Sequence, residues 1–142
     1  MNISPYILAI VVSWIVAQGA KYVIMALRNK SLKGYRQLYL SGNMPSAHTA
    51  TVVSMATAIG LREGIDSAVF GVAAMVAGVV MYDAVMFRRS VGEQGIAIKK
   101  VITLTKSKVE LPRAAKGHTP AEVAVGAVLG VLIGVVVFIA TQ

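Results

Sequence analysis

The sequence predicts an all-α protein, a polytopic membrane helix bundle with about four transmembrane helices. Three observations lead to this fold class. Of the 142 residues, 56% are hydrophobic and 14% are charged, whereas a soluble domain carries about 25% charged residues. The mean hydropathy is +0.71. Three stretches are also apolar for long enough to cross a bilayer, which takes about 20 residues in a helix.

Four segments of one domain, residues 1–142, are expected to be helices. The strong spans are residues 3–27, 66–87 and 120–140, each interrupted by few polar side chains. Residues 44–61 are shorter and rich in Ala, Ser and Thr. Small residues let helices approach closely. We therefore expect this segment to be a helix buried among the other three.

The first apolar run is interpreted as a span and not as a cleaved leader. No Lys or Arg precedes it, and residues 3–27 exceed the apolar core of a cleaved signal, about 7–15 residues.

Charge indicates the orientation in the membrane. Four spans place both termini on one side, together with the connection that contains Arg62. Arg62 is one of 14 Lys and Arg residues. The other 13 lie at or near the opposite side, mostly in loops 28–43 and 88–117. The positive-inside rule makes that side cytoplasmic. A site for an anionic ligand would gather cations there too, so the bias has two candidate causes.

The two long connections have different compositions. Loop 28–43 mixes Lys and Arg with Tyr35 and Tyr39, which is typical of a membrane interface. Loop 88–117 is basic and contains spaced apolar residues between Ile96 and Leu104. These residues predict an amphipathic piece that lies on the membrane surface, either helical or extended.

Composition also excludes several classes of site. The absence of Cys excludes disulfides and Cys-based zinc sites, and two His residues cannot form a three-His metal site. Aromatic residues make up 6% of the chain, which argues against a nucleic-acid stacking module. The net charge of +8 therefore favours anionic lipid headgroups as partners.

The last span contains a ridge of glycines, Gly126, Gly130 and Gly134, at intervals of four residues. Missing side chains on one helix face let another helix approach closely. The ridge is expected to pack a helix of the same chain, or a second copy of the chain in a homodimer.

Polar residues that are costly to bury gather at one end of the predicted bundle, because four separate segments bring them to the same membrane face. They are Lys21, Arg28, Ser46, His48, Asp83, Arg88, Arg89, His118 and Glu122. Lys21 and Arg28 lie on one face of their helix and point at one target, or else extend separately to the interface. Asp83 is expected to be a structural partner of a cation, either Lys21 or an arginine.

Two helix starts in this set have a structural and a chemical interpretation. Ser46 can cap the second helix, or its hydroxyl and the free amides can bind phosphate. His48 lies one turn inside and could donate a proton. Thr119 and Glu122 form a capping box around a proline. Glu122 can also reach His118, four residues earlier, and leave its other ring nitrogen free to attack an electrophile.

At these residues the chain resembles the PAP2 superfamily of phosphatases and haloperoxidases, and more closely its divergent PAP2 branch of small bacterial, archaeal and plastid membrane proteins. Lys21-x6-Arg28 is similar to K-x6-R-P, with Asn29 for proline. Pro45-Ser46-Ala47-His48 is similar to P-S-G-H, and His118-x3-Glu122 to the end of S-R-x5-H-x3-D. The divergent branch shows M-Y-D-A…R-R and G-H-T-P-x-E-V, matched by residues 81–84 with Arg88-Arg89 and by residues 117–123.

The resemblance implies a PAP2-like core and metal-free hydrolysis of a lipid phosphate or diphosphate ester, without a cofactor. His118 would form a phosphohistidine, Glu122 would orient it, and His48 would protonate the leaving group and then activate water. Lys21, Arg28, Ser46, Arg88 and Arg89 would bind the phosphate, with Asp83 and Thr119 in structural roles. The resemblance also implies a prokaryotic cell membrane. Classical members of the superfamily often work on the outer face, whereas the Lys and Arg bias of this chain places the active site on the cytoplasmic side.

The chain departs from the superfamily pattern at the arginine of the third motif. Arg88 and Arg89 lie about thirty residues before His118, and Arg113 is one residue too close to it. We prefer Arg88, on the expectation that it ends a helix. The alternative to an enzyme is a non-catalytic anionic-lipid binding protein or lipid transporter that uses the same basic pocket.

Overall fold

The computed structural model describes residues 3–29, 44–112 and 117–142, apart from the side chains of the last two residues of the first range. These ranges are helical and contain no strand, which confirms the predicted fold class. The elements are α1 (Pro5–Asn29), α2 (Ala47–Glu63), α3 (Ala68–Tyr82), the π-helical turn η2 (Asp83–Phe87), α4 (Arg88–Leu104) and α5 (Pro120–Ala140).

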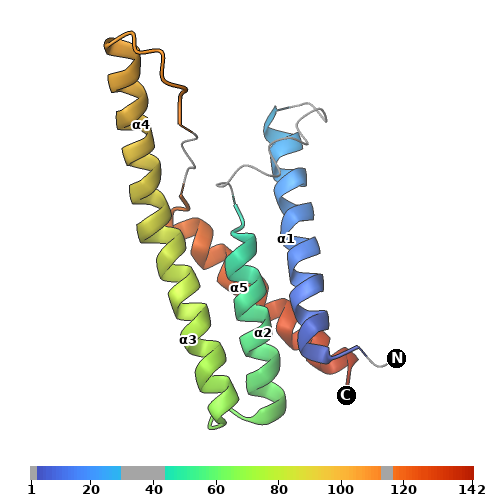
Figure 1. The fold of residues 1–142 in the computed structure, drawn as a ribbon. Coiled ribbons are helices and arrows are strands. Elements are labelled where there is room, and N and C mark those ends of the chain that lie inside the picture. Colours follow the sequence, from blue (N-terminus) through green and yellow to red (C-terminus); the bar gives the residue numbers. More distant parts are fainter. Residues whose placement is uncertain (1–2, 30–43, 113–116) are drawn as a thin grey trace.

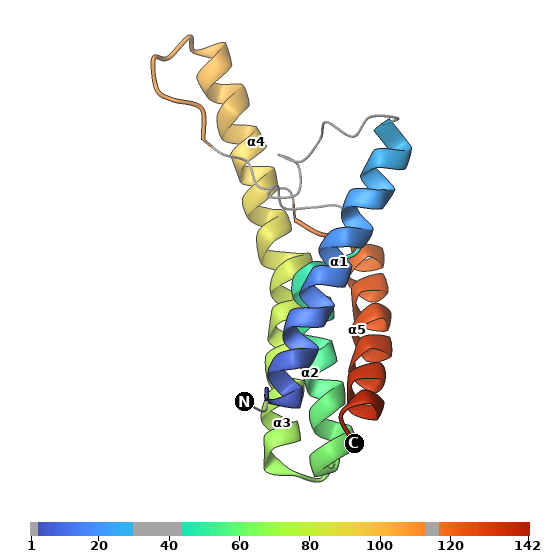
Figure 2. The same ribbon diagram turned by 90° about the vertical axis from the view of Figure 1, so that its right-hand side faces the viewer.

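α2 is the centre of the bundle. It packs against α1, α3 and α5, and α1 also contacts α5 (Figures 1 and 2). Its buried residues are small or β-branched, among them Ala50, Ser54 and Ala58. The Ser54 hydroxyl donates a hydrogen bond of 3.2 Å to the carbonyl of Ala9 on α1. The expectation that residues 44–61 form a helix buried among the others is confirmed.

The glycine ridge of α5 makes the closest helix contact in this bundle. A Cβ at Gly130 would lie 2.6 Å from the Ala50 carbonyl oxygen, and one at Gly134 would lie 2.7 Å from that of Ser54. Gly126 meets the Ser46 carbonyl in the same way. The ridge is therefore occupied by α2 of the same chain. The expectation that the ridge packs a helix of the same chain therefore holds in this fold, and a homodimer through these glycines would have to displace α2.

Three helices within the described ranges are long and apolar enough to cross a membrane: Pro5–Leu27, the continuous helix Ala68–Leu104, and Pro120–Ala140. Their outer faces expose large apolar side chains. Trp14 is 51% exposed and Val72 is 60% exposed. Such a surface is stable against lipid and not against water. The protein is thus a helical membrane bundle, in which α2 is a shorter fourth helix.

Both described ends of the chain lie at the same end of the bundle as the α2–α3 connection (Figures 1 and 2). The start of α2, the start of α5 and η2 lie toward the opposite end. This alternation agrees with the topology expected from four spans. It brings the segments that hold the candidate site residues to one end.

One sequence expectation was wrong. Residues 88–104 are not loop: α4 continues α3 through η2, so that Ala68–Leu104 is one helix of 37 residues. No proline interrupts this stretch, and the pair Arg88-Arg89 marks a change in polarity without a break in the backbone. The amphipathic piece accordingly projects away from the bundle as a helix (Figure 1).

Candidate active site

His118 lies in the short segment before α5 and is almost completely buried, with 3% of its surface exposed. Its backbone N–H donates a hydrogen bond of 3.1 Å to the carbonyl of Ala84 in η2. Neither ring nitrogen has a hydrogen-bond partner among the described residues. Buried polar atoms normally have partners. An imidazole with two unpartnered nitrogens is therefore a strong candidate for a group that meets a ligand.

The π turn and a glycine hold this segment against the long helix. In η2 the Arg88 N–H bonds to the Asp83 carbonyl, five residues earlier, which interrupts the regular α-helical ladder. The Ala84 carbonyl accepts from His118 at this interruption. A Cβ at Gly117 would lie 2.4 Å from the Arg89 backbone nitrogen, so a larger residue could not approach so closely. Backbone contacts thus fix the position of His118.

The start of α5 carries the predicted capping box. The Thr119 N–H donates to Glu122 Oε2 at 2.9 Å, and the Glu122 N–H donates to Thr119 Oγ1 at 3.3 Å. The structural roles of Thr119 and Glu122 as cap residues are confirmed. The further expectation, a hydrogen bond from His118 to Glu122, is not met: Glu122 Oε2 accepts from the Thr119 N–H, and neither ring nitrogen of His118 has a partner among the described residues. Glu122 acts on His118 through its charge.

Ser46 connects the starts of α2 and α5. It is fully buried, and its Oγ accepts from the Thr49 N–H at 3.4 Å and from Thr49 Oγ1 at 2.9 Å. Its backbone N–H donates to the Glu122 carbonyl at 3.2 Å. The capping interpretation of Ser46 is therefore confirmed. Its role as a phosphate ligand stays a prediction.

Several charges converge on His118. Burial lowers the pKa of His118 below its usual value, and the positive charge of Lys21 lowers it further. The carboxylate of Glu122 acts in the opposite direction, while His48 and Arg88 make smaller contributions that lower the pKa. His118 is accordingly neutral near pH 7, with a free lone pair. Groups from α1, α2, the long helix and α5 lie within electrostatic range of one imidazole.

His48 and Lys21 differ in exposure. His48 is exposed in the first turn of α2, and Lys21 is partly buried on α1. The charges of Arg88, Lys21 and Asp83 all act on His48. The two imidazoles are thus within electrostatic range of each other at the same end of the bundle.

The two arginines of the long helix are each paired with a carboxylate. Arg88 Nε lies 2.7 Å from Asp83 Oδ2, which confirms the expected structural pairing of Asp83 with an arginine. Arg89 Nε lies 3.1 Å from Glu93 Oε1, one turn along. Both arginines lie inside the continuous helix and not at its end. The side chain of Arg28, and Arg113 as a whole, lie outside the described residues.

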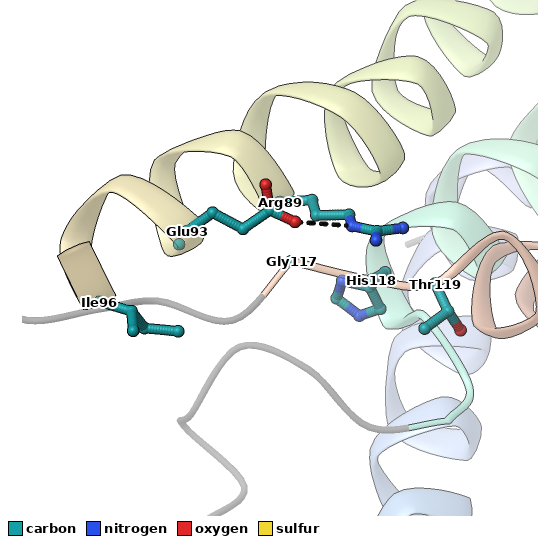
Figure 3. A pocket seen from close by; sticks show the side chains of 7 residues that line it. Arg89, Glu93, Ile96, Gly117, His118 and Thr119 are labelled. Atoms are coloured by element: carbon teal, nitrogen blue, oxygen red, sulfur yellow. Dashed lines mark hydrogen bonds and ion pairs between the residues drawn. The ribbon is translucent and has the colours of Figure 1, made fainter.

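A pocket of about 390 Å³ opens beside His118, between its segment and α4 (Figure 3). Its lining residues are Arg89, Gly92, Glu93, Ile96, Gly117, His118 and Thr119. Sequence reasoning missed the contributions of Glu93, Gly92 and Ile96, because it treated this stretch as loop. Gly92, Glu93 and Ile96 lie three, four and seven residues after Arg89, which places all of them on one helix face. Within the described residues, no group of three or more His, Cys, Asp or Glu side chains could hold a metal.

The family model of the divergent PAP2 family matches residues 3–133. The chain belongs to the divergent PAP2 family. A relative in Bacillus subtilis (strain 168), the uncharacterized membrane protein YuiD, is 34% identical over 111 residues, which cover 68% of this chain and 70% of YuiD. No solved structure matches this divergent PAP2 protein.

Proposed function

We propose that this divergent PAP2 protein is a membrane lipid phosphate phosphatase that works through a phosphohistidine. Its substrates would be of the phosphatidate, phosphatidylglycerophosphate or polyprenyl (di)phosphate type. The observation that supports this most is His118: it is buried, its pKa is lowered, its ring has no hydrogen-bond partner among the described residues, and it lines a pocket together with Arg89.

The reaction would proceed in two displacements. A ring nitrogen of His118 attacks phosphorus, the P–O bond to the lipid breaks, and His48 gives a proton to the leaving oxygen. His48 then takes a proton from water, which attacks phosphorus and breaks the P–N bond to release phosphate. Lys21, Arg28, Arg88 and Arg89 supply positive charge for the phosphoryl oxygens. The carboxylate of Glu122 stabilises the positively charged ring of the intermediate.

The test is phosphate release from phosphatidate, a polyprenyl phosphate and p-nitrophenyl phosphate by purified protein in detergent. His118→Ala should lower kcat by about 10³-fold or more on all three, because the nucleophile is lost. His48→Ala should lower kcat by about 10²-fold or more on the lipids. With p-nitrophenyl phosphate, His48→Ala should lower the rate of the first displacement much less, because p-nitrophenolate leaves without needing a proton.

Trapping of an acid-labile, base-stable phosphoenzyme in wild type, and its absence in His118→Ala, would support the intermediate. Activity that survives His118→Ala would refute the proposed nucleophile.

A second candidate is a non-catalytic anionic-lipid binding protein or lipid transporter. One observation favours it: Glu122 is held in the capping box and does not orient the His118 ring, as a carboxylate does in many histidine-dependent hydrolases. This candidate predicts headgroup binding that persists in His118→Ala, and no phosphate release by wild type from any of the three substrates.

A further inference from the structure

One face of α4 carries a groove that extends beyond the candidate active site. The pocket beside His118 ends at Ile96, and a second pocket of about 500 Å³ begins at the same residue. The second pocket is lined by Ile96, Lys99, Lys100, Thr103 and Leu104. These positions continue the spacing of Arg89, Gly92 and Glu93, so both pockets lie along one face of the helix.

The groove is positively charged at both of its ends. Arg89 lies next to His118, and Lys99 and Lys100 lie two to three turns farther from the bundle. Glu93 is the one carboxylate among the described lining residues. A strip with three cations and one carboxylate has the composition of a site for an extended anion, and it opens at one end on a buried imidazole that has no partner within the described part of the chain.

The ion pair of Arg89 with Glu93 would not prevent such binding. The two side chains are 60% and 67% exposed. Exposed ion pairs between neighbouring helix turns contribute little to stability. An anion that enters the groove could therefore replace Glu93 as the partner of Arg89 at small cost.

The length of the long helix places this face outside the bilayer. Thirty-seven residues span roughly 55 Å, whereas the hydrocarbon core is about 30 Å thick. The half that carries Lys99 and Lys100 projects from the bundle (Figure 1). A lipid tail would stay between the spans, so the groove suits a polar part of the ligand that extends away from the membrane.

We propose that the Arg89, Lys99 and Lys100 face of α4 is a second phosphate-binding subsite. This inference depends on the proposed function, since it assigns to His118 the phosphate bonded to the lipid. Attack there forms the P–N bond and breaks the P–O bond to the lipid; with a diphosphate substrate, water then breaks the P–N bond and releases diphosphate. The second phosphate has two sources with the same chemistry: the distal phosphate of a lipid diphosphate, or inorganic phosphate released by the reaction.

The test uses two substrates with one tail, farnesyl phosphate and farnesyl diphosphate. The variant is Lys99→Gln with Lys100→Gln, and the matched control is Lys106→Gln with Lys108→Gln, which removes the same charge from residues outside the groove. If the distal phosphate binds here, the variant raises the KM for the diphosphate by about tenfold or more, since charge-assisted hydrogen bonds are lost. In the same variant the KM for the monophosphate should change less than about twofold. In the control variant the KM values for both substrates should also change less than about twofold.

Inorganic phosphate as inhibitor distinguishes the two sources. If the released ion occupies the subsite, its inhibition constant rises in the variant while neither KM changes. Glu93→Gln should lower the constant that rises in the lysine variant, either the KM for the diphosphate or the inhibition constant of phosphate, because it frees Arg89 for the anion. Equal changes in the variant and the control, or no change in any of these constants, would overturn the subsite.

The failure of the proposed function would look different. Wild type would then release neither phosphate from farnesyl phosphate nor diphosphate from farnesyl diphosphate. Binding of inorganic phosphate, measured by calorimetry on wild type, the variant and the control, would still report on the subsite. Binding weakened in the Lys99→Gln, Lys100→Gln variant alone would support it, and equal binding in all three proteins would refute it.

Discussion

At the scale of single residues, His118 loses nearly all contact with solvent and gains no hydrogen-bond partner for its ring within the described residues. Desolvation disfavours the charged form of an imidazole. The neutral form therefore persists below the usual pKa of about 6.5, and the acid limb of kcat/KM should lie below that pH. The Lys21 charge acts in the same direction and the Glu122 charge against it.

Glu122→Gln tests this electrostatic role. A glutamine can still accept the Thr119 N–H, so the cap and the fold should be retained. The variant removes the negative charge that raises the pKa of His118, so that pKa falls and the acid limb of kcat/KM moves to lower pH. The measurement is the pH–rate profile on phosphatidate, with Glu110→Gln as control. An acid limb that stays in place or moves to higher pH contradicts the assigned role.

Residue patterns predicted several local contacts correctly. The capping box at Thr119 follows from a Thr, a Pro and a Glu in fixed positions, and the cap at Ser46 follows from a similar pattern. The carboxylate–imidazole contact between Glu122 and His118 was not decided by spacing, because two partners competed for one carboxylate. The candidate site residues themselves stay predictions until activity is measured.

At the scale of elements, the contact between α5 and α2 depends on residues without side chains. A Cβ added to any of the three glycines of α5 would lie 2.6–2.7 Å from a backbone carbonyl oxygen of α2 or of its N-cap residue Ser46. The same carbonyls belong to the segment that begins with Ser46, so this contact also sets the distance between the starts of the two helices.

Gly130→Ala should separate α5 from α2 and destabilise the bundle by about 1–3 kcal/mol, as overpacking does. Gly78→Ala is the matched control: Gly78 lies in α3 with nothing within 4 Å of an added Cβ. Alanine there should leave stability unchanged or raise it slightly through helix propensity. Thermal unfolding in detergent measures both. Equal midpoints for the two variants would show that the glycine contact is not tight in solution.

The boundary of α3 could not be read from the sequence. Charges at Arg88 and Arg89 mark the exit of a helix from the bilayer, and a helix can continue through that point. The continuation decides two features of the site. It creates the Ala84 carbonyl contact to His118, and it adds the α4 face to the pocket.

At the scale of the whole molecule, the polar groups of the site lie at one end of the bundle, opposite the described chain ends (Figures 1 and 2). The bias of Lys and Arg toward that end predicts that it is cytoplasmic. A cytoplasmic site would take lipid phosphates from the inner leaflet.

Single cysteines test the orientation, since the chain has none of its own. Asp66→Cys lies in the α2–α3 connection and Ser107→Cys follows α4; both positions are exposed. In intact cells an impermeant maleimide should label Asp66→Cys, and it should label Ser107→Cys only after permeabilisation. The reverse pattern would place the candidate active site on the outer face.

The sequence by itself determined the class of the protein: apolar runs of sufficient length require spanning helices, and short motifs fix helix starts through local hydrogen bonds. These effects act between residues a few positions apart. Only the tertiary structure decided that the glycine ridge is used by α2 and that Glu93 and Ile96 line a pocket together with His118. Those outcomes depend on which backbones approach each other across the bundle, and local spacing carries no such information.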